Sequence, residues 1–185
     1  MYTYDTFKVT IENHVAHVAF NRPQKSNSLN ALAWKEMKAI FEAIDEDENV
    51  RAVILQGEGK NFCAGIDLAL LMNIQQYNQV KCEGRKRELI RKFIKELQDC
   101  ITSIEKCRKP VLAAIHRACI GGAVDIISAC DMRYCTEDAY FSIREIDLGL
   151  VADIGTLQRL PKILNSGIVA EMAYTGRNVG GKEAK

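Results

Sequence analysis

The sequence contains no apolar run that approaches the roughly 18 residues of a membrane-spanning helix. Its start, Met-Tyr-Thr-Tyr-Asp-Thr, also lacks the apolar segment of a signal peptide. Neither sign of charge dominates, because 25 basic and 24 acidic residues leave a formal net charge of +1. We therefore expect a protein that is neither inserted in a membrane nor secreted and that has no general electrostatic attraction to nucleic acid.

The sequence also lacks the residue patterns of a metal site or of a disulfide framework. It has three histidines, and its seven cysteines, an odd number, include no Cys-x-x-Cys pair. We expect reduced thiols that are mostly buried, and no metal site.

What the sequence does contain is the composition of a globular domain, with 48% hydrophobic and 26% charged residues over a length of 185. Its apolar patterns predict strands at 7–11, 15–20, 52–55, 111–115 and 132–135. Helical periodicity predicts helices over 29–44, 89–104, from 122 onward and over 154–160, the first of them capped by Asn27 or Ser28. Strand–strand–helix units thus recur about every 45 residues, which indicates stacked turns rather than one doubly wound sheet.

Two glycine-containing loops, 62–68 and 119–125, each lead into a predicted helix. The start of a helix leaves backbone N–H groups unpaired, so two such starts that face each other would together hold one oxyanion. For either loop taken alone, glycine before a helix is more often ordinary turn chemistry.

Three carboxylates, Asp125, Glu145 and Asp153, lie in a stretch that is otherwise mostly apolar. Loss of hydration in such surroundings raises the pKa of a carboxyl group toward values that suit proton transfer. A structural alternative stands for two of them, because Asp153 could cap the predicted helix 154–160 and Glu145 could be a solvated loop residue.

The order and spacing of these features resemble the crotonase, or enoyl-CoA hydratase/isomerase, superfamily. The matching segments are Asn21-Arg22-Pro23 with Ser28-Leu29, then 62–68, 109–115, Ile120-Gly121-Gly122 and 129–133. The resemblance covers essentially all 185 residues. It implies an α/β crotonase-like spiral of repeated ββα turns, in which 1–185 form a single catalytic domain without the C-terminal helical region of relatives.

The resemblance also implies an acyl-CoA substrate and a homotrimer or homohexamer in the mitochondrial matrix or the peroxisome, with no membrane or nucleic-acid partner. The backbone N–H groups of Ile66 and Gly122 would form the oxyanion hole for the thioester carbonyl. The residues implied to lie against the coenzyme A portion are Lys25, Ala64, Gly65, Asp67 and Leu68. Since coenzyme A belongs to the substrate and the two N–H groups hold the anionic intermediate, no separate cofactor or metal is expected.

Within the family, the acidic residues separate the reactions. Asp125 and Glu145 stand where hydratases carry the acid pair that activates water, whereas the additional Asp153 resembles the Δ3,5-Δ2,4-dienoyl-CoA isomerase branch. The resemblance thus implies isomerisation of 3,5-dienoyl-CoA to 2,4-dienoyl-CoA in fatty acid β-oxidation. We expect Asp153 to be the base at C2, Glu145 the acid at C6, and Asp125 the partner that positions or tunes them.

Two alternatives remain at this point. One is an enoyl-CoA hydratase that adds water to 2-enoyl-CoA through Asp125 and Glu145. The other is a non-catalytic RNA-binding protein of the same fold, suggested by basic residues in one predicted helix: Lys81, Arg85, Lys86, Arg87, Arg91, Lys92 and Lys95. The ordinary interpretation of that helix is a solvated face. Arg117 and Ala123 depart from the family pattern, because glycine is usual near both positions.

Overall fold

A five-stranded sheet of order β1-β2-β3-β4-β6 forms one layer of the computed structural model, which describes residues 3–185 except for the side chains of 73–75 and 78. Its strands are β1 (Phe7–Glu12), β2 (Val15–Phe20), β3 (Ala52–Gly57), β4 (Val111–Ile115) and β6 (Met132–Cys135). β1 and β2 form an antiparallel hairpin, and the pairs from β2 onward are parallel. The hairpin turn consists of Asn13 and His14, both at positive φ, which gives a twist that suits the flanking strands.

A smaller sheet of order β5-β7-β8 contains β5 (Ala118–Ile120), β7 (Tyr140–Ser142) and β8 (Val179–Gly180). The chain passes twice from the larger sheet to the smaller one, because β4 leads into β5 and β6 leads into β7, and both pairs of strands, β4 with β6 and β5 with β7, are parallel. The chain therefore winds in stacked turns, and the expected crotonase-like spiral is confirmed.

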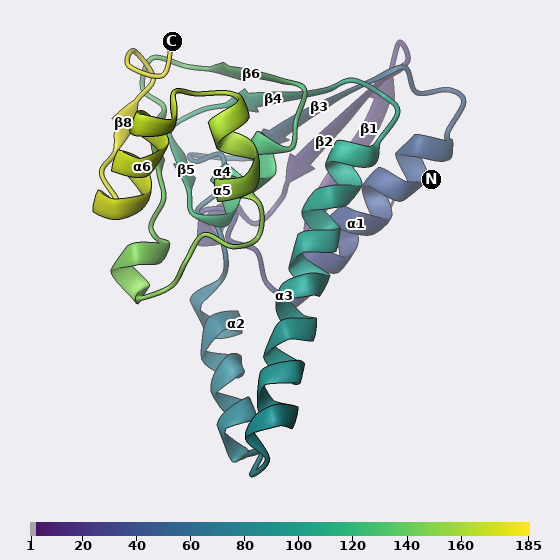
Figure 1. Cartoon of the computed structure of the whole chain (residues 1–185). Helices are drawn as coiled ribbons and strands as arrows, with labels where there is room; N and C mark the ends of the chain where they lie inside the picture. The colour runs from purple at the N-terminus through teal and green to yellow at the C-terminus, as the bar shows by residue number, and fades with distance from the viewer. Residues whose placement is uncertain (1–2) are drawn as a thin grey trace.

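The described part of the chain contains six α-helices and four short 3-10 helices. The α-helices are α1 (Ala31–Glu46), α2 (Leu68–Asn73), α3 (Glu83–Lys106), α4 (Gly122–Ser128), α5 (Thr156–Arg159) and α6 (Ser166–Thr175). The 3-10 helices are η1 (Pro23–Lys25), η2 (Ile74–Gln79), η3 (Glu145–Leu148) and η4 (Leu160–Lys162). In Figure 1, α2 and the first half of α3 extend together, away from the sheets, as an arm. The second half of α3 returns to the body and packs beside α1.

Two predicted helix starts were wrong. Asn30, not Asn27 or Ser28, caps α1, and its side chain accepts a hydrogen bond from the N–H of Ala33 at 2.9 Å. α5 begins at Thr156 after Gly155, without a side-chain cap. Asp153 is therefore not the cap of that helix.

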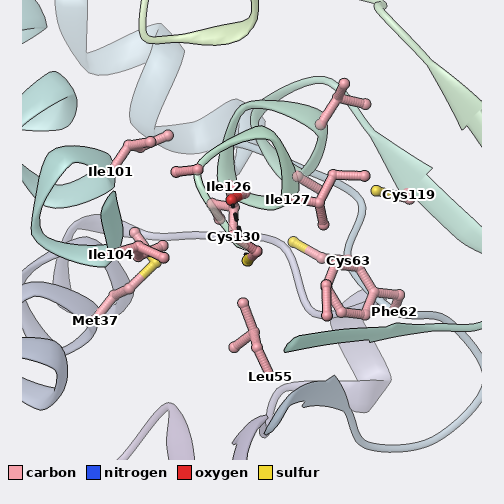
Figure 2. Close-up of a cluster of buried hydrophobic side chains, with 14 of the residues drawn as sticks. Met37, Leu55, Phe62, Cys63, Ile101, Ile104, Cys119, Ile126, Ile127 and Cys130 are labelled. Atoms are coloured by element: carbon pink, nitrogen blue, oxygen red, sulfur yellow. Dashed lines mark hydrogen bonds between the residues drawn. The ribbon is translucent and has the colours of Figure 1, made fainter. Parts of the chain in front are cut away.

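The core between α1, α3, α4 and the large sheet is apolar and rich in sulfur (Figure 2). It includes the fully buried Met37, Leu55 and Ile104 as well as the thiols of Cys63 and Cys130. All seven cysteines are free, and four of them are buried. Burial raises the pKa of the Cys63 and Cys130 thiols to about 12, so these thiols stay protonated and unreactive.

Nothing in the described part of the chain forms a helix that is both long and apolar enough to span a bilayer. Among those same residues, no group of three or more His, Cys, Asp or Glu side chains is placed to hold a metal ion.

Candidate active site

The two glycine-containing loops predicted from the sequence lie side by side. Cys63 pairs with Cys119 in a parallel bridge, in which the Cys63 N–H donates to Ala118 at 3.0 Å and the Ile120 N–H donates to Cys63 at 3.1 Å. A second bridge joins Ile66 to Leu29 on the other side. The backbone therefore fixes where both loops turn.

Ile66 and Gly122 meet at this point with their N–H groups unused. Within the described residues, neither N–H donates a hydrogen bond to another protein group. A Cβ atom built on Gly122 would stand 3.6 Å from the Ile66 nitrogen, so the two backbones are close neighbours. Gly65, at φ +81°, has no room for a side chain, because a Cβ there would collide with the Ile120 carbonyl and lie 3.0 Å from the Gly122 nitrogen. Two unpaired donors held this way have the character of an oxyanion hole.

The indole ring of Trp34 lies beneath Gly122. Its Cζ2 and Cη2 atoms would each be 3.6 Å from a Cβ on Gly122. The ring is buried and its Nε1–H has no partner among the described residues. The amphipathic pattern of α1 predicts burial of Trp34, but nothing in the sequence connects it with the loop at Gly122.

A cavity of about 230 Å³ adjoins the unpaired N–H groups. Five of the residues that the sequence nominated line it: Ala64, Ile66, Leu68, Gly122 and Glu145. The other five, Lys25, Gly65, Asp67, Asp125 and Asp153, are not part of its lining. Leu71, Leu148 and Leu150 add apolar surface, which suits an acyl chain.

Glu145 begins η3, and its carboxylate turns back toward the start of α4. Its Oε1 would be 3.2 Å from a Cβ on Gly121, so the glycine, at φ +54°, leaves room for the carboxylate. Its Oε2 is buried without a hydrogen-bond partner among the described residues. Burial raises the pKa of Glu145, and the negative charge of Asp153 raises it further. Glu145 is therefore not a solvated loop residue.

Asp125 is fully buried on α4. Its Oδ1 accepts a hydrogen bond from the N–H of Thr156 at 2.5 Å, and its Oδ2 has no partner in the described structure. Burial raises the pKa of Asp125 to about 7, the charges of Glu145 and Asp153 add to the rise, and the hydrogen bond from the Thr156 N–H opposes it. Thr156 was not identified from the sequence, because its contact with Asp125 spans 31 residues.

Asp153 lies between η3 and α5 and is half-buried. It lines a second cavity, of about 340 Å³, together with Gln98, Thr102 and Arg159, and no residue lines both cavities. Burial raises the pKa of Asp153. Because its charge raises the pKa values of both Asp125 and Glu145, the three carboxyl groups form one interacting cluster.

Residues 10–185 match the family described as "Enoyl-CoA hydratase/isomerase". The chain belongs to the enoyl-CoA hydratase/isomerase family. Among curated relatives, it is 48% identical to the peroxisomal Delta(3,5)-Delta(2,4)-dienoyl-CoA isomerase of Arabidopsis thaliana, with 100% of this chain and 68% of the relative covered. It is 45% identical to the mitochondrial enzyme of that name from Mus musculus, with 99% of this chain and 57% of the relative covered. The chain thus spans between 57% and 68% of the length of these relatives.

Solved structures agree with the fold. The chain superposes on an enoyl-CoA hydratase from Bacillus anthracis with a TM-score of 0.83 at 31% identity, covering 98% of this chain and 67% of that one. A putative enoyl-CoA hydratase from Streptomyces coelicolor A3(2) gives a TM-score of 0.87 at 25% identity, covering 98% and 64%.

Two departures from the family pattern now have a place in the structure. Arg117 adopts φ +49°, a conformation that favours glycine, and its side chain forms an exposed ion pair with Asp138 at 3.7 Å. It does not line the cavity beside the oxyanion hole. Ala123 is fully buried on α4, where its methyl group belongs to the core.

Asp67 and Lys25 are the two charged residues that the sequence nominated to contact coenzyme A, and both lie outside the cavity lining. Asp67 is ion-paired with Arg22 at 3.2 Å and accepts a hydrogen bond from the Ser28 hydroxyl at 3.3 Å. Lys25 is exposed at the end of η1. The contacts expected between coenzyme A and Lys25, Gly65 and Asp67 stay predictions.

Proposed function

We propose that this protein is an isomerase that converts 3,5-dienoyl-CoA to 2,4-dienoyl-CoA in fatty acid β-oxidation. The observation that carries the proposal is a cluster of three interacting carboxyl groups beside two unpaired backbone N–H donors. In the reaction one carboxylate removes a proton from C2, the electrons move through the conjugated system onto the thioester oxygen, and a second carboxyl group returns a proton at C6. Substrate and product are isomers, so no other reactant is consumed.

The cluster is suited to hold an acid and a base at the same time. Three nearby carboxyl groups that are buried do not all ionise together, because each charge disfavours the next. With a pKa of about 7 on Asp125 and raised pKa values on Glu145 and Asp153, the site retains a proton near neutral pH. Asp125 carries this proton part of the time, and the raised pKa of Asp153 favours its protonated form, which is the form that the reaction requires of the acid.

The position of Glu145 supports its assignment as the base that removes the proton from C2, which reverses the roles expected from the sequence. When the thioester oxygen lies between the N–H groups of Ile66 and Gly122, C2 is only two bonds from that oxygen. The Glu145 carboxylate approaches Gly121, next to this point, and lines the same cavity. Asp153 lies outside that lining and is the group for C6, four bonds farther along the acyl chain. Asp125 positions and tunes the other two.

The proposal extends to the cofactor, the compartment and the oligomeric state. The substrate supplies coenzyme A, so we propose that the protein uses no separate cofactor or metal. The relatives are named as peroxisomal and mitochondrial enzymes, and we propose one of these compartments for this protein. We also propose that it works as a homotrimer or homohexamer.

The decisive experiment offers the purified protein 3,5-dienoyl-CoA and 2-enoyl-CoA in separate assays. We expect the conjugated 2,4-dienoyl-CoA to form from the first and little 3-hydroxyacyl-CoA to form from the second. Rapid hydration of 2-enoyl-CoA without isomerisation of the diene would replace this proposal with the hydratase alternative. That alternative is favoured by one observation, the unpartnered oxygens of the buried pair Asp125 and Glu145, which could hold a water molecule.

The basic residues of α3 do not support the RNA-binding alternative. Six of the seven lie in α3, since Lys81 precedes it, and three of these six pair with acidic residues of the same helix at separations of three or four positions. The pairs are Lys86 with Glu83, Arg91 with Glu88, and Lys95 with Asp99. Such pairing is typical of the solvated face of a helix.

A further inference from the structure

The segment that carries Asp153 contains no regular secondary structure. Residues 149–155 belong to neither a helix nor a strand. Three N–H groups of the segment donate local backbone bonds, from Gly149 to Ile146 at 3.0 Å, from Leu150 to Glu145 at 2.9 Å and from Asp153 to Val151 at 2.8 Å. None of these bonds attaches Asp153 to another packed element, so contacts with other elements fix its location.

Gln98 of α3 makes such an attachment. Its Nε2–H donates to the backbone carbonyl oxygen of Asp153 at 2.8 Å, across 55 residues of sequence. Gln98 is half-buried and follows Leu97 on the side of α3 that packs against the body. The turn is also pressed against α3 at Gly155, where a Cβ would collide with Arg159 and lie 3.6 Å from Ile101.

The bond constrains the Asp153 carboxyl group, because the carbonyl and the side chain share one Cα atom. Without this donor the carbonyl oxygen of the part-buried turn would lack a partner, and rotation of the peptide toward another partner would move the side chain as well. The amide of Gln98 is suited to fix the Asp153 carbonyl because it carries no charge. A cation in its place would also fix the carbonyl but would lower the pKa of the carboxyl group that has to deliver a proton.

We propose that Gln98 is a positioning residue that holds Asp153 where it delivers the proton to C6. This inference rests on the proposed isomerase function. Gln98 does not line the cavity beside the oxyanion hole, so we expect its loss to act mainly on the distal half of the reaction.

The test uses Gln98→Met, which keeps the length of the side chain and removes the donor. Displacement of a reacting group by about 1 Å can cost on the order of 100-fold, so we expect kcat for 3,5-dienoyl-CoA to fall by roughly 10- to 100-fold with KM unchanged. Exchange of the C2 hydrogen with D₂O should continue, because it depends on Glu145, which the substitution leaves in place. Gln158→Met is the matched control. Gln158 lines the second cavity, as Gln98 and Asp153 do, but it is exposed and is not hydrogen-bonded to Asp153.

A second variant, Gln98→Lys, keeps a donor at the same place. We expect it to retain most of the parental kcat and to move the alkaline limb of the pH profile, which reports the essential acid, to lower pH. Gln98→Lys also tests the positioning role if Gln98→Met fails to fold. Full activity of Gln98→Lys with an unshifted alkaline limb of the pH profile would then overturn the inference.

Two results with Gln98→Met would refute the positioning role. One is an unchanged kcat, and the other is a parallel loss of isomerisation and C2 exchange, which would indicate general damage to the site. Failure of the proposed function is recognised separately, because the parent protein itself would then leave 3,5-dienoyl-CoA unchanged.

Discussion

Among single residues, Asp125 has the least ordinary environment. It is an acid with no exposed surface, and one of its two oxygens has no partner among the described residues. Burial of a polar group without a partner costs about 1–3 kcal/mol. Because the pKa of Asp125 is about 7, the carboxyl group is protonated in acidic solution, which reduces this cost. The N–H of Thr156 binds its other oxygen.

Asp125→Asn should change how stability depends on pH. The pKa of Asp125 is raised in the folded protein, from 3.8 to about 7. Its contribution to the free energy of unfolding is therefore complete below pH 4 and is lost as pH rises to 7. The expected loss is roughly 4 kcal/mol at 1.36 kcal/mol per pKa unit. Asn does not ionise and still accepts the Thr156 bond, so the variant should exceed the parent in stability at pH 8. Urea unfolding of the parent and the variant at pH 5 and pH 8 measures the two free energies of unfolding. An equal decrease between these pH values in both proteins would show that Asp125 does not cause the pH dependence.

Gly122→Val tests the oxyanion hole. A Cβ at this position makes only ordinary contacts of 3.6 Å, with Ile66 and Trp34, so the fold should persist. The two added methyl groups would fill the space between the N–H donors and block the thioester oxygen. Loss of one such donor costs about 100- to 1000-fold in kcat, and we expect at least this decrease in a steady-state isomerase assay. Gly180→Val is the control, because a Cβ there meets nothing within 4 Å. Near-parental turnover of a folded Gly122→Val protein would remove this loop from the mechanism.

At the scale of secondary-structure elements, the connection between β2 and α1 supports the oxyanion loop. Asn27 is buried at φ +57°. Its Nδ2 donates to three carbonyl oxygens, those of Glu58, Asn61 and Phe62, at 2.8–3.1 Å. Its Oδ1 accepts the N–H of Arg22. Asn27 thus joins the segment that includes η1 to the segment that leads into the site, which explains why it does not cap α1.

Asn27→Asp should destabilise the protein without changing the size of the side chain. Asp also tolerates positive φ, but it has no donor for the three carbonyl oxygens and would place a negative charge against them. We expect the free energy of unfolding to fall by at least about 2–3 kcal/mol, measured by urea or thermal unfolding. The exposed Asn21→Asp provides a control with the same chemical change. Equal stability of the two variants would mean that the Asn27 network contributes little.

At the scale of the whole molecule, the site depends on segments that are distant in sequence. Asp125 comes from α4, Glu145 from η3, and Asp153 from the irregular segment that α3 holds in place. Contacts join these segments in turn, because Thr156, close to Asp153 in the chain, binds Asp125, Glu145 approaches Gly121, and Gly122 neighbours Ile66.

Isotope exchange in D₂O distinguishes the two proton-transfer roles. If Glu145 removes the C2 proton, Glu145→Gln should lose C2 exchange and isomerisation together. Asp153→Asn should retain C2 exchange but lose most isomerisation, because loss of a positioned acid or base typically costs a factor of about 100 to 10,000. Both variants should still bind acyl-CoA, which is the control for folding. The opposite pattern would restore the roles expected from the sequence.

Local patterns in the sequence determined much of this protein. Apolar periodicity determined the five strands of the larger sheet and the helices α1 and α3, since that signal depends only on neighbouring residues, but it did not predict the smaller sheet, α2 or α6. The two glycine loops and the three carboxylates were likewise identified from residue type and order. The cap of α1 was not identified from the sequence, because the side chain of Asn27 binds carbonyl groups that are distant in the chain and that a local pattern cannot include.

Only the tertiary structure decided how the residues of the site divide between its cavities. It placed Glu145 with the oxyanion hole and Asp153 on a separate cavity, although the two are eight residues apart in one short stretch. It also added Trp34, Thr156 and Gln98, whose contacts with the site join residues far apart in the chain. Such contacts depend on the packing of whole elements, and no sequence period encodes that packing.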